Sequence, residues 1–419
     1  MSPKTPLICF EDALAATLSE IDPLRGETIP VAYLVGRVTA DDLIALVDSP
    51  SIDVSLKDGY AVRSADVIAA TPQHPVPLKL IGDLAAAGDP SLATIQAGDT
   101  VRILSGAAIP EGADAVLAEE FADEEGDTII ATADAGPGRN ILPKGTDVCK
   151  GQCIIPAGTV LRPAQVGLLA AAGHHEAAVV KQPRVAIIAT GTEVIAPGHP
   201  LKAGKIYASN LVTLSAWCRH YGMTPSTTVV ADDRAAIEAA LVEALEDHDA
   251  LVTSGGAWTG ERDLVARLLD AMGWRKVYHR VRIGPGKAVG FGLCRDKPVF
   301  ILPGGPPSNQ MAFLQLALPG LHRLAGFLEP GLPTRSVRLA ATVTGQRDWT
   351  QFIEGRFEKT RDGIEFRPQK QESRLQSMAN CEGYLMIPEG ISSLEAGREV
   401  PIQTLPFVNL LHRSQRSEF

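Results

Sequence analysis

The sequence has few aromatic residues, no excess of positive charge and no long apolar run. Aromatic residues make up only 5% of the 419 residues, so the cores must consist mostly of aliphatic side chains. The net charge of −10 argues against a protein whose whole surface binds nucleic acid, although it leaves room for a local basic pocket that binds a small anion. No window approaches the roughly 20 apolar residues that a membrane span requires, so we expect no membrane partner.

Paired metal-binding cysteines are also missing. The six cysteines are scattered, and the closest pair, Cys149 and Cys153, does not have the CxxC spacing of a zinc site. This pattern is typical of reduced thiols in a cytoplasmic protein. The apolar run Leu7–Phe10 is far too short for the core of a signal peptide, and apolar residues continue from it at helical spacing to Ile21. We therefore expect a cytoplasmic location.

Strand-like and helix-like patterns alternate between residues 182 and 328. Three aliphatic stretches, at 183–191, 249–256 and 297–305, each end in glycine, and stretches with helical spacing separate them. Such alternation indicates a mostly parallel sheet with helices on both faces, that is, a doubly wound α/β domain. The stretch at 277–283 is interpreted as one further strand of this domain.

The rest of the chain has short apolar stretches broken by glycine, proline and aspartate. This pattern is typical of strands and turns, and it predicts a β-rich domain at 54–147 and a small barrel-like or sandwich-like β domain at 333–408. Residues 1–53 and 148–181 flank the β-rich insertion and are interpreted as one discontinuous, partly helical domain that links it to the α/β domain at 182–328. The predicted fold class is therefore multidomain α/β.

Glycine or polar clusters follow three strands of the predicted parallel sheet. Ligands bind at the carboxyl ends of strands in such sheets, and glycine lets a ligand approach the backbone closely. One Gly-Gly turn alone is more often a mere turn, but three on one sheet favour a site for an anion such as phosphate. The candidate residues at these ends are Glu193, Ser254, Gly255, Gly256, Pro303, Gly304, Pro306 and Ser308.

Positive charge gathers in the segment that ends at Lys287. In a strand, Arg280, Arg282 and Gly284 share one face, because side chains alternate with a period of two. Guanidinium groups bind phosphate oxygens through two hydrogen bonds, so two arginines on one face predict phosphate binding. The alternative is a solvated face with salt bridges at its rim.

Acidic residues are predicted beside the same sheet edge. They are Glu193, Asp232 and Asp263, with Asp58 and Asp147 contributed by the first half of the chain. Carboxylates beside phosphates usually hold Mg²⁺, which bridges to the substrate. Taken singly, Asp232 is also explained as a helix cap and Asp263 as a carboxylate in a first helical turn.

Serine nucleophiles are disfavoured. Ser105, Ser308 and Ser373 are candidates by residue type, but the chain has no GxSxG elbow and nothing ties a histidine to any of them. Serine hydrolysis is therefore set aside, and these serines are treated as candidate ligands of the substrate.

Eight blocks, taken together, resemble one family. They are KDGYAVRSAD at 57–66, LSGAAIPEGADAVLAEE, GRNILPKGTDV, ATGTEV, GKIYASN, TSGGAWTGERD, GPGKAVGFG and LPGGPPSN. In this order and at this spacing they resemble the molybdopterin molybdenumtransferases and the C-terminal domain of gephyrin. The resemblance runs from about residue 10 to 405, essentially the whole chain.

The resemblance implies an elongated subunit of four domains that forms a homodimer. It also implies the last step of molybdenum cofactor assembly, in which adenylylated molybdopterin is cleaved, molybdate is inserted at the dithiolene and AMP is released with the help of Mg²⁺. Catalytic roles are implied for Asp58, Glu193, Asp232 and Asp263, the last three also as metal ligands. Substrate-binding roles are implied for Ser105, Asp147, Arg280, Pro303, Pro306 and Ser373. The strand ends and the basic segment add Ser254, Gly255, Gly256, Arg282, Lys287, Gly304 and Ser308 as candidate substrate ligands.

Two departures from the family pattern bear on activity. Thr192 stands where the family has an aspartate before the glutamate, and Gly284 stands where it has a lysine before PGK. Arg282 lies two residues before Gly284, so we hypothesise that it supplies the missing charge. The departures indicate a paralogue with altered metal handling or weakened catalysis.

The leading prediction is thus an Mg²⁺-dependent molybdenumtransferase. The alternative is a non-catalytic protein that holds molybdopterin or the finished cofactor and delivers it to a client molybdoenzyme, which the changes at Thr192 and Gly284 favour. A third hypothesis, an enzyme acting on another nucleotide-linked substrate, rests on the α/β domain alone.

Overall fold

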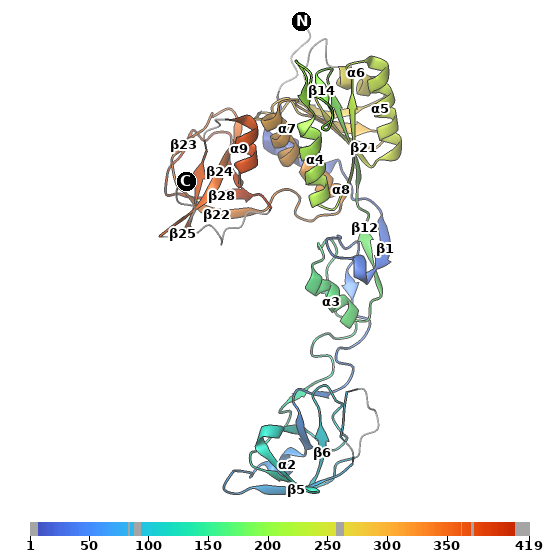
Figure 1. The fold of residues 1–419 in the computed structure, drawn as a ribbon, viewed down its shortest axis with the longest axis vertical. Coiled ribbons are helices and arrows are strands. Elements are labelled where there is room, and N and C mark those ends of the chain that lie inside the picture. The colour runs from blue at the N-terminus through green and yellow to red at the C-terminus, as the bar shows by residue number, and fades with distance from the viewer. Residues whose placement is uncertain are drawn as a thin grey trace.

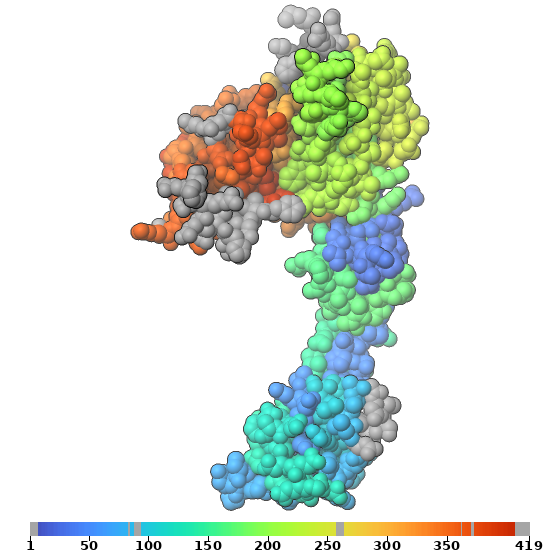
Figure 2. Space-filling model, viewed as in Figure 1, coloured from blue at the N-terminus to red at the C-terminus, as the bar shows by residue number. Residues whose placement is uncertain are grey.

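The molecule is elongated and consists of several units strung along one axis (Figure 1). The computed structural model describes residues 7–82, 84–87, 94–256, 264–361, 363–369 and 373–406. A β unit containing β5 and β6 lies at one end, and the α/β unit lies at the other with a second β unit packed against its side (Figure 2). A narrow linking unit joins the two ends.

The β unit at the far end is one six-stranded sheet in the order β7-β4-β6-β5-β9-β8. Aliphatic side chains such as Val62, Leu78 and Ile129 form its core, in keeping with the shortage of aromatic residues. Its elements are β4 (Gly59–Val62), α2 (Ser64–Val67), β5 (Val76–Leu80), β6 (Asp99–Ile103), β7 (Ala115–Ala118), η2 (Glu119–Phe121), β8 (Ala122–Glu125) and β9 (Thr128–Ala131).

The linking unit is built from short paired strands and one helix. β1 pairs antiparallel with β12, and β2 pairs with β11, so the chain passes through this unit twice. The elements are β1 (Gly26–Pro30), η1 (Val31–Tyr33), β2 (Leu43–Ile44), β11 (Cys153–Ile155), α3 (Pro163–Ala171) and β12 (Glu176–Val180), and the pair β3 (Val54–Ser55) and β10 (Ile141–Leu142) leads to the far β unit.

A six-stranded sheet in the order β16-β13-β17-β21-β20-β18 forms the centre of the α/β unit. The first four strands are parallel, and β20 and β18 are antiparallel additions at one edge. The elements are β13 (Arg184–Thr190), β14 (Val194–Ile195), β15 (Ile206–Tyr207), α4 (Ser209–His220), β16 (Thr224–Val230), α5 (Arg234–Asp247), β17 (Ala250–Ser254), α6 (Leu264–Ala271), β18 (Arg275–His279), β20 (Gly290–Cys294), β21 (Lys297–Leu302), α7 (Pro306–Ala312), the π-helical segment η3 (Phe313–Ala317) and α8 (Leu318–Leu324).

Both faces of this sheet are buried, which explains its unbroken aliphatic strands. Along β13, Val185 and Ile187 point into a core shared with α4, α7 and α8, whereas Ala186 and Ile188 point into a second core under α5 and α6. The prediction of a doubly wound, mostly parallel sheet is therefore confirmed.

The first helix corrects our division of the chain. Residues 1–53 were assigned to the linking domain, but α1 (Phe10–Ser19) packs against α8 and the π-helical segment of the α/β unit. Phe10 and Ala13 are buried in the same core as Val185. The helical spacing identified the helix, but it carried no information about which unit the helix covers.

The C-terminal β unit closes on itself as a barrel. Its strands follow the order β24-β25-β22-β28-β26, and β26 also pairs with β24. The elements are β22 (Thr334–Leu339), β23 (Val343–Thr344), β24 (Thr350–Thr360), β25 (Gly363–Pro368), α9 (Arg374–Asn380), β26 (Gly383–Ile387), β27 (Ser393–Leu394) and β28 (Glu399–Thr404). A short strand from the α/β unit, β19 (Ile283–Gly284), adds to β24 and joins the two units.

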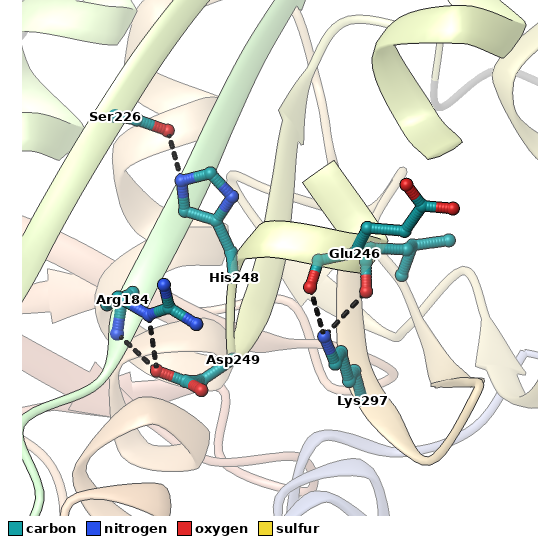
Figure 3. A network of polar contacts seen from close by, with 7 residues as sticks. Arg184, Ser226, Glu246, His248, Asp249 and Lys297 are labelled. Carbon is teal, nitrogen blue, oxygen red and sulfur yellow. Dashed lines mark hydrogen bonds and ion pairs between the residues drawn. The ribbon is translucent and has the colours of Figure 1, made fainter. Parts of the chain in front are cut away.

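Polar side chains at the amino ends of the parallel strands bind neighbouring backbone groups and side chains (Figure 3). Asp249 accepts a hydrogen bond from the backbone N–H of Arg184 at 2.8 Å, and Ser226 lies 2.7 Å from a ring nitrogen of His248. Lys297 Nζ donates to the carbonyl oxygen of Leu245 at 2.5 Å, at the C-terminal end of α5, where a cation suits the helix dipole. The amino ends of these strands are thus occupied by structural contacts, which leaves their carboxyl ends for a ligand.

His322 on α8 is expected to make the stability of the α/β unit depend on pH. Its ring stacks on Phe327, its Nδ1 accepts the N–H of Gly331 at 3.0 Å, and its Nε2 is buried without a hydrogen-bond partner within the described ranges. Burial, with a smaller effect from nearby His220, lowers the pKa of His322 to about 3. The folded protein therefore keeps this ring neutral while the unfolded chain protonates it below a pKa of about 6.5.

Stability is accordingly expected to fall as the pH falls from about 6.5 toward 4, by up to about 1.4 kcal/mol per pH unit from this one group. Chemical denaturation at a series of pH values measures the slope. His322→Gln should flatten it, because glutamine has no proton to bind in this range, whereas His175→Gln on the exposed surface should leave it unchanged. Equal slopes for wild type and His322→Gln would contradict this account.

Candidate functional site

A cavity of about 850 Å³ opens at the carboxyl ends of the parallel strands of the α/β unit. The turns after β13, β17 and β21 line it, and so do the first residues of α4 and the loop before β20. Gln346 and Trp349 reach it from the C-terminal β unit. The cavity therefore lies where open α/β sheets bind their ligands, with one wall supplied by a second unit.

Two carboxylates line one end of the cavity. Glu193 follows β13 and Asp232 follows β16, and these strands are direct neighbours in the sheet. Asp232 accepts a hydrogen bond from the backbone N–H of Thr192 at 3.1 Å, and Lys205 Nζ donates to the carbonyl oxygen of Thr192 at 2.5 Å. The turn that presents Glu193 is thus fixed on both sides through the backbone of Thr192.

Glu193 folds back over the turn. A Cβ atom added to Gly191 would lie 2.8 Å from Oε2 of Glu193, so a side chain at this position would displace the carboxylate. Gly191 therefore serves a steric purpose, because it leaves room for the acidic group that faces the cavity.

Two asparagines connect the end of β17 to the turn after β21 through hydrogen bonds. Nδ2 of Asn210 on α4 donates to the hydroxyl of Ser254 at 3.0 Å and to the carbonyl oxygen of Gly304 at 2.9 Å. Nδ2 of Asn309 on α7 donates to the same hydroxyl at 3.1 Å and to the carbonyl oxygen of Pro303 at 2.8 Å. Neither asparagine was predicted for the site. The sequence signal that could have identified them is the Ser-Asn pair that ends both GKIYASN and LPGGPPSN.

Gly255 is expected to tolerate no side chain. Its φ is +105°, and a Cβ atom would lie 2.9 Å from the carbonyl oxygen of Thr190. We expect Gly255→Ala to destabilise the protein by about 1–3 kcal/mol, because both the conformation and the contact are unfavourable. Thermal unfolding measures this. Gly305→Ala is the matched control, since Gly305 has a φ of −71° and no atom within 4 Å of an added Cβ. Equal losses in both variants would contradict the steric argument.

The side of the cavity next to β20, which is separated from β13 by β17 and β21 in the sheet, is cationic and aromatic. Lys287 Nζ lies 4.9 Å from the centre of the Trp349 ring, over its face. Among the described residues that line the cavity, Lys287 is the only lysine or arginine. The cavity is therefore polarised, with carboxylates under β13 and β16 and an ammonium group beside the C-terminal β unit.

The carboxylates fit the predicted Mg²⁺ in the chemistry of their donors. Mg²⁺ prefers oxygen ligands, and it is usually bound by one or two carboxylates with water and substrate phosphates completing the shell. Glu193 and Asp232 are such a pair. The described ranges contain no group of three or more His, Cys, Asp or Glu residues that would hold a metal by themselves. Asp263, the third predicted ligand, lies outside the described residues.

Comparisons with known proteins agree with this arrangement along the whole chain. The family models called MoeA N-terminal region (domain I and II), probable molybdopterin binding domain, and MoeA C-terminal region (domain IV) match residues 8–173, 186–323 and 336–405, respectively. A molybdopterin molybdenumtransferase 2 from Mycobacterium tuberculosis is 33% identical over 387 residues, or 91% of this chain and 95% of the relative. The chain belongs to the molybdopterin molybdenumtransferase family.

Other relatives support the same assignment. A molybdopterin molybdenumtransferase from Staphylococcus aureus is 28% identical over 398 residues, which covers 94% of this chain and 95% of the relative. Two crystal structures of a molybdopterin biosynthesis MoeA protein from Pyrococcus horikoshii are 31% and 29% identical, with TM-scores of 0.81 and 0.82 and coverage of at least 95% of both chains. Family and fold class are thereby confirmed, and the chain is a transferase of molybdenum cofactor biosynthesis.

Within this transferase, many of the predicted site residues come together. Those that line the cavity are Glu193, Asp232, Ser254, Gly255, Gly256, Lys287, Pro303, Gly304, Pro306 and Ser308. Their individual roles stay predictions. Among the described residues, no helix is both long and apolar enough to cross a membrane.

The arginine face predicted from the sequence is wrong. β18 ends at His279, and Arg280 has a φ of +74°, because its N–H turns to bind the carbonyl oxygen of Val289 at 2.7 Å. Strand alternation therefore stops before Arg282. The Arg282 guanidinium binds both carboxylate oxygens of Glu389, at 2.9 and 3.0 Å, and donates to the carbonyl oxygen of Leu7.

Arg282 consequently does not replace the lysine missing at Gly284. Neither Arg280 nor Arg282 lines the cavity, whereas Gly284 does. The ion pair with Glu389 raises the pKa of the Arg282 guanidinium and ties the C-terminal β unit to the α/β unit. Its contribution is to hold the two units together at the wall of the cavity.

Asp58 directly precedes β4 and Ser105 closely follows β6, so both lie in the far β unit and not in the cavity of the same chain. Figure 1 shows this unit at the opposite end of the molecule from the α/β unit. There the Asp58 carboxylate accepts the backbone N–H of Ser105 at 2.7 Å, beside a second, shallower hollow lined by Lys57 and Glu119. Asp147 is exposed, and its N–H binds the carbonyl oxygen of Ser49 near the linking unit. These predicted residues are thus separated from the cavity within one chain.

Ser373 also lies away from the cavity lining. It caps α9, because its hydroxyl accepts the backbone N–H of Gln376 at 3.4 Å. The cap is a sufficient structural reason for a serine at this position.

Proposed function

We propose that this transferase inserts molybdate into adenylylated molybdopterin and releases AMP, with Mg²⁺ bound at Glu193 and Asp232. The observation that carries the proposal is the polarity of the cavity, with two carboxylates at one end and Lys287 at the other. A phosphoanhydride bridged by a cation suits the carboxylate end, and the molybdate dianion suits the ammonium end. Glycine turns between the ends let the substrate approach the backbone.

The protein contributes positioning and electrostatics to this reaction. Bound at the two carboxylates, Mg²⁺ would supply charge neutralisation on the phosphoanhydride. The backbone hydrogen bonds to Thr192 hold Glu193 and Asp232 in place without a carboxylate at position 192. Lys287 holds molybdate beside the dithiolene. Catalysis of this kind depends on groups that are already oriented before the substrate arrives.

We further propose that the working enzyme is a homodimer. Asp58 and Ser105 belong to the far β unit, which lies at the other end of the molecule from the α/β unit (Figure 1), so a second copy is needed to bring them to the cavity. The linking unit and the start of the far β unit also expose several large apolar side chains, and such groups on a surface mark protein contacts. They are Tyr33, Val35, Leu46, Val47, Ile52 and Leu56.

Two other parts of the proposal rest on the sequence. A cytoplasmic location agrees with six free thiols, which the structure leaves unpaired. We also propose the domain bounds 54–147 for the β-rich insertion and 333–408 for the C-terminal β domain.

The test uses purified protein, adenylylated molybdopterin, MgCl₂ and molybdate, with AMP measured by chromatography. The enzyme is expected to release AMP and to yield cofactor that activates an apo-molybdoenzyme, and removal of Mg²⁺ with a chelator should stop both. Tight binding of the substrate without AMP release would overturn the proposal. That result would instead favour the carrier function, with delivery to a client molybdoenzyme, for which the change at Thr192 is the observation in favour.

A further inference from the structure

Trp349 is an aromatic side chain presented to the cavity by the C-terminal β unit. It lines the cavity beside Lys287 and is only half-buried, although it belongs to a different unit from most of the lining residues. The Lys287 ammonium lies over its ring, 4.9 Å from the ring centre. A planar ligand ring can stack on the part of such an indole that Lys287 leaves uncovered at the cavity wall.

The turn that carries Trp349 is fixed by four hydrogen bonds. The N–H of Trp349 donates to the carbonyl oxygen of Gln346 at 3.0 Å, and the N–H of Gln346 donates to the side-chain oxygen of Gln351 at 2.7 Å. The N–H of Thr350 binds the carbonyl oxygen of Arg282, and the carbonyl oxygen of Arg347 accepts from Gly390. The backbone that presents the indole is therefore held in place before any ligand binds, which lowers the entropy lost on stacking.

The same contacts connect the turn to the floor of the cavity. β24 begins at Thr350 and pairs with β19, so Trp349 lies directly beside the loop that leads to Lys287. The ion pair between Arg282 and Glu389 closes the junction of the two units next to Gly390. Arg282 thus acts as a positioning residue, since it keeps the C-terminal β unit, and with it Trp349, against the cavity.

The chemistry of the proposed substrate decides which ring belongs at this end. Adenylylated molybdopterin has two planar ring systems, pterin and adenine, on either side of a phosphoanhydride. Molybdate is inserted at the dithiolene, which is fused to the pterin half, and the cation suited to molybdate is Lys287. The pterin half therefore belongs at the end of Lys287 and Trp349, and the phosphoanhydride extends toward Glu193.

We infer that Trp349 is the stacking platform for the pterin ring of the substrate, positioned by the Arg282–Glu389 pair. This inference rests on the proposed function for the identity of the ring. It assigns the C-terminal β unit a direct part in substrate recognition, because the platform comes from that unit while the charged groups come from the α/β unit.

The test is calorimetric titration of the full-length protein with 6-hydroxymethylpterin and, separately, with AMP. Stacking of a base on an aromatic side chain is worth about 1–3 kcal/mol, so Trp349→Leu should weaken pterin binding roughly ten-fold or more. Trp349→Phe keeps a ring and should lose much less. AMP binding should change by less than about two-fold in both variants, because adenine lies at the other end of the site.

A second measurement addresses positioning. Glu389→Gln should weaken pterin binding less than Trp349→Leu does, and it should leave AMP binding unchanged. Trp349→Leu should raise KM for adenylylated molybdopterin with kcat largely kept, as expected when binding common to ground and transition states is removed. Thermal unfolding of each variant checks that the fold is intact.

Unchanged pterin affinity and KM in Trp349→Leu would overturn the inference, and so would a wild-type protein that binds no pterin. A loss of AMP affinity in place of pterin affinity would also overturn it, because it would place adenine on the indole. A wild-type protein that binds pterin but releases no AMP from the substrate would contradict the proposed function alone, and the Leu and Phe variants would still decide the role of Trp349.

Discussion

Replacing Lys287 with alanine is expected to lower molybdate-dependent AMP release by about two to three orders of magnitude, the loss typical of removing one donor aimed at a charged reacting group. Lys287 is the only lysine or arginine among the described residues that line the cavity. Glu193 and Asp232, at the other end, carry negative charge. A dianion placed there without Lys287 meets no opposite charge from these lining side chains. Glycine stands at position 284, where the family pattern has a second lysine. Because no second cation remains when Lys287 is removed, the loss of rate is larger.

The measurement is the dependence of AMP release on molybdate concentration. Lys287→Arg should retain part of the rate, because the charge is kept, whereas Lys287→Met should behave like the alanine variant. Lys276→Met is the matched control, since Lys276 pairs with Asp270 outside the cavity and its loss should leave the rate unchanged. Wild-type rates of AMP release in Lys287→Ala would show that molybdate does not bind at this end of the cavity.

Mixing two inactive chains is expected to restore activity if the homodimer is the working unit. Asp58→Asn disables the contribution of the far β unit, and Lys287→Ala disables the cavity. In a two-fold symmetric dimer whose sites combine both chains, each mixed dimer has one intact site and one doubly disabled site, so isolated mixed dimers should show about half of wild-type activity.

The two chains are co-expressed with different affinity tags, and mixed dimers are isolated through both tags before AMP release is measured. Each variant alone should release little AMP. Activity in neither the single variants nor the mixed dimers would mean that Asp58 acts within its own chain. Failure to recover mixed dimers through both tags would mean that no such dimer forms. Wild-type activity of Asp58→Asn alone would remove Asp58 from the reaction.

The strand ends of the site were predictable because their signals are local. A continuous aliphatic strand ending in glycine, as at Thr190 or Ser254, carries both the buried sheet and the open turn in a few consecutive residues. Parallel strands then bring such turns to one edge whatever lies between them. For this reason Glu193, Asp232 and the PGG turn reached one cavity as expected.

The failures depend on contacts that strand periodicity does not encode. Period-two alternation placed Arg280 and Arg282 on one strand face, but a hydrogen bond from Arg280 to Val289 breaks the strand and gives Arg280 a positive φ that is uncommon for its residue type. Arg282 is held by Glu389, more than one hundred residues away. No local pattern encodes such a partner.

Trp349 was missed for a similar reason. Nothing in its neighbourhood in the sequence resembles a binding motif, and it reaches the cavity only because β24 pairs with β19 across the boundary between two units. The same holds for the helix α1. The spacing of its apolar residues predicted a helix, but not the core that this helix covers. Periodicity defines elements, and tertiary pairing decides their neighbours.

The most direct test of the central claim is a crystal structure of the protein grown with AMP, Mg²⁺ and molybdate. The account predicts one occupied cavity at the carboxyl ends of β13, β17 and β21, with molybdate beside Lys287 and the phosphate of AMP toward Glu193 and Asp232. Density for molybdate at the carboxylate end, or for either ligand only in the hollow beside Asp58 and Ser105, would contradict it.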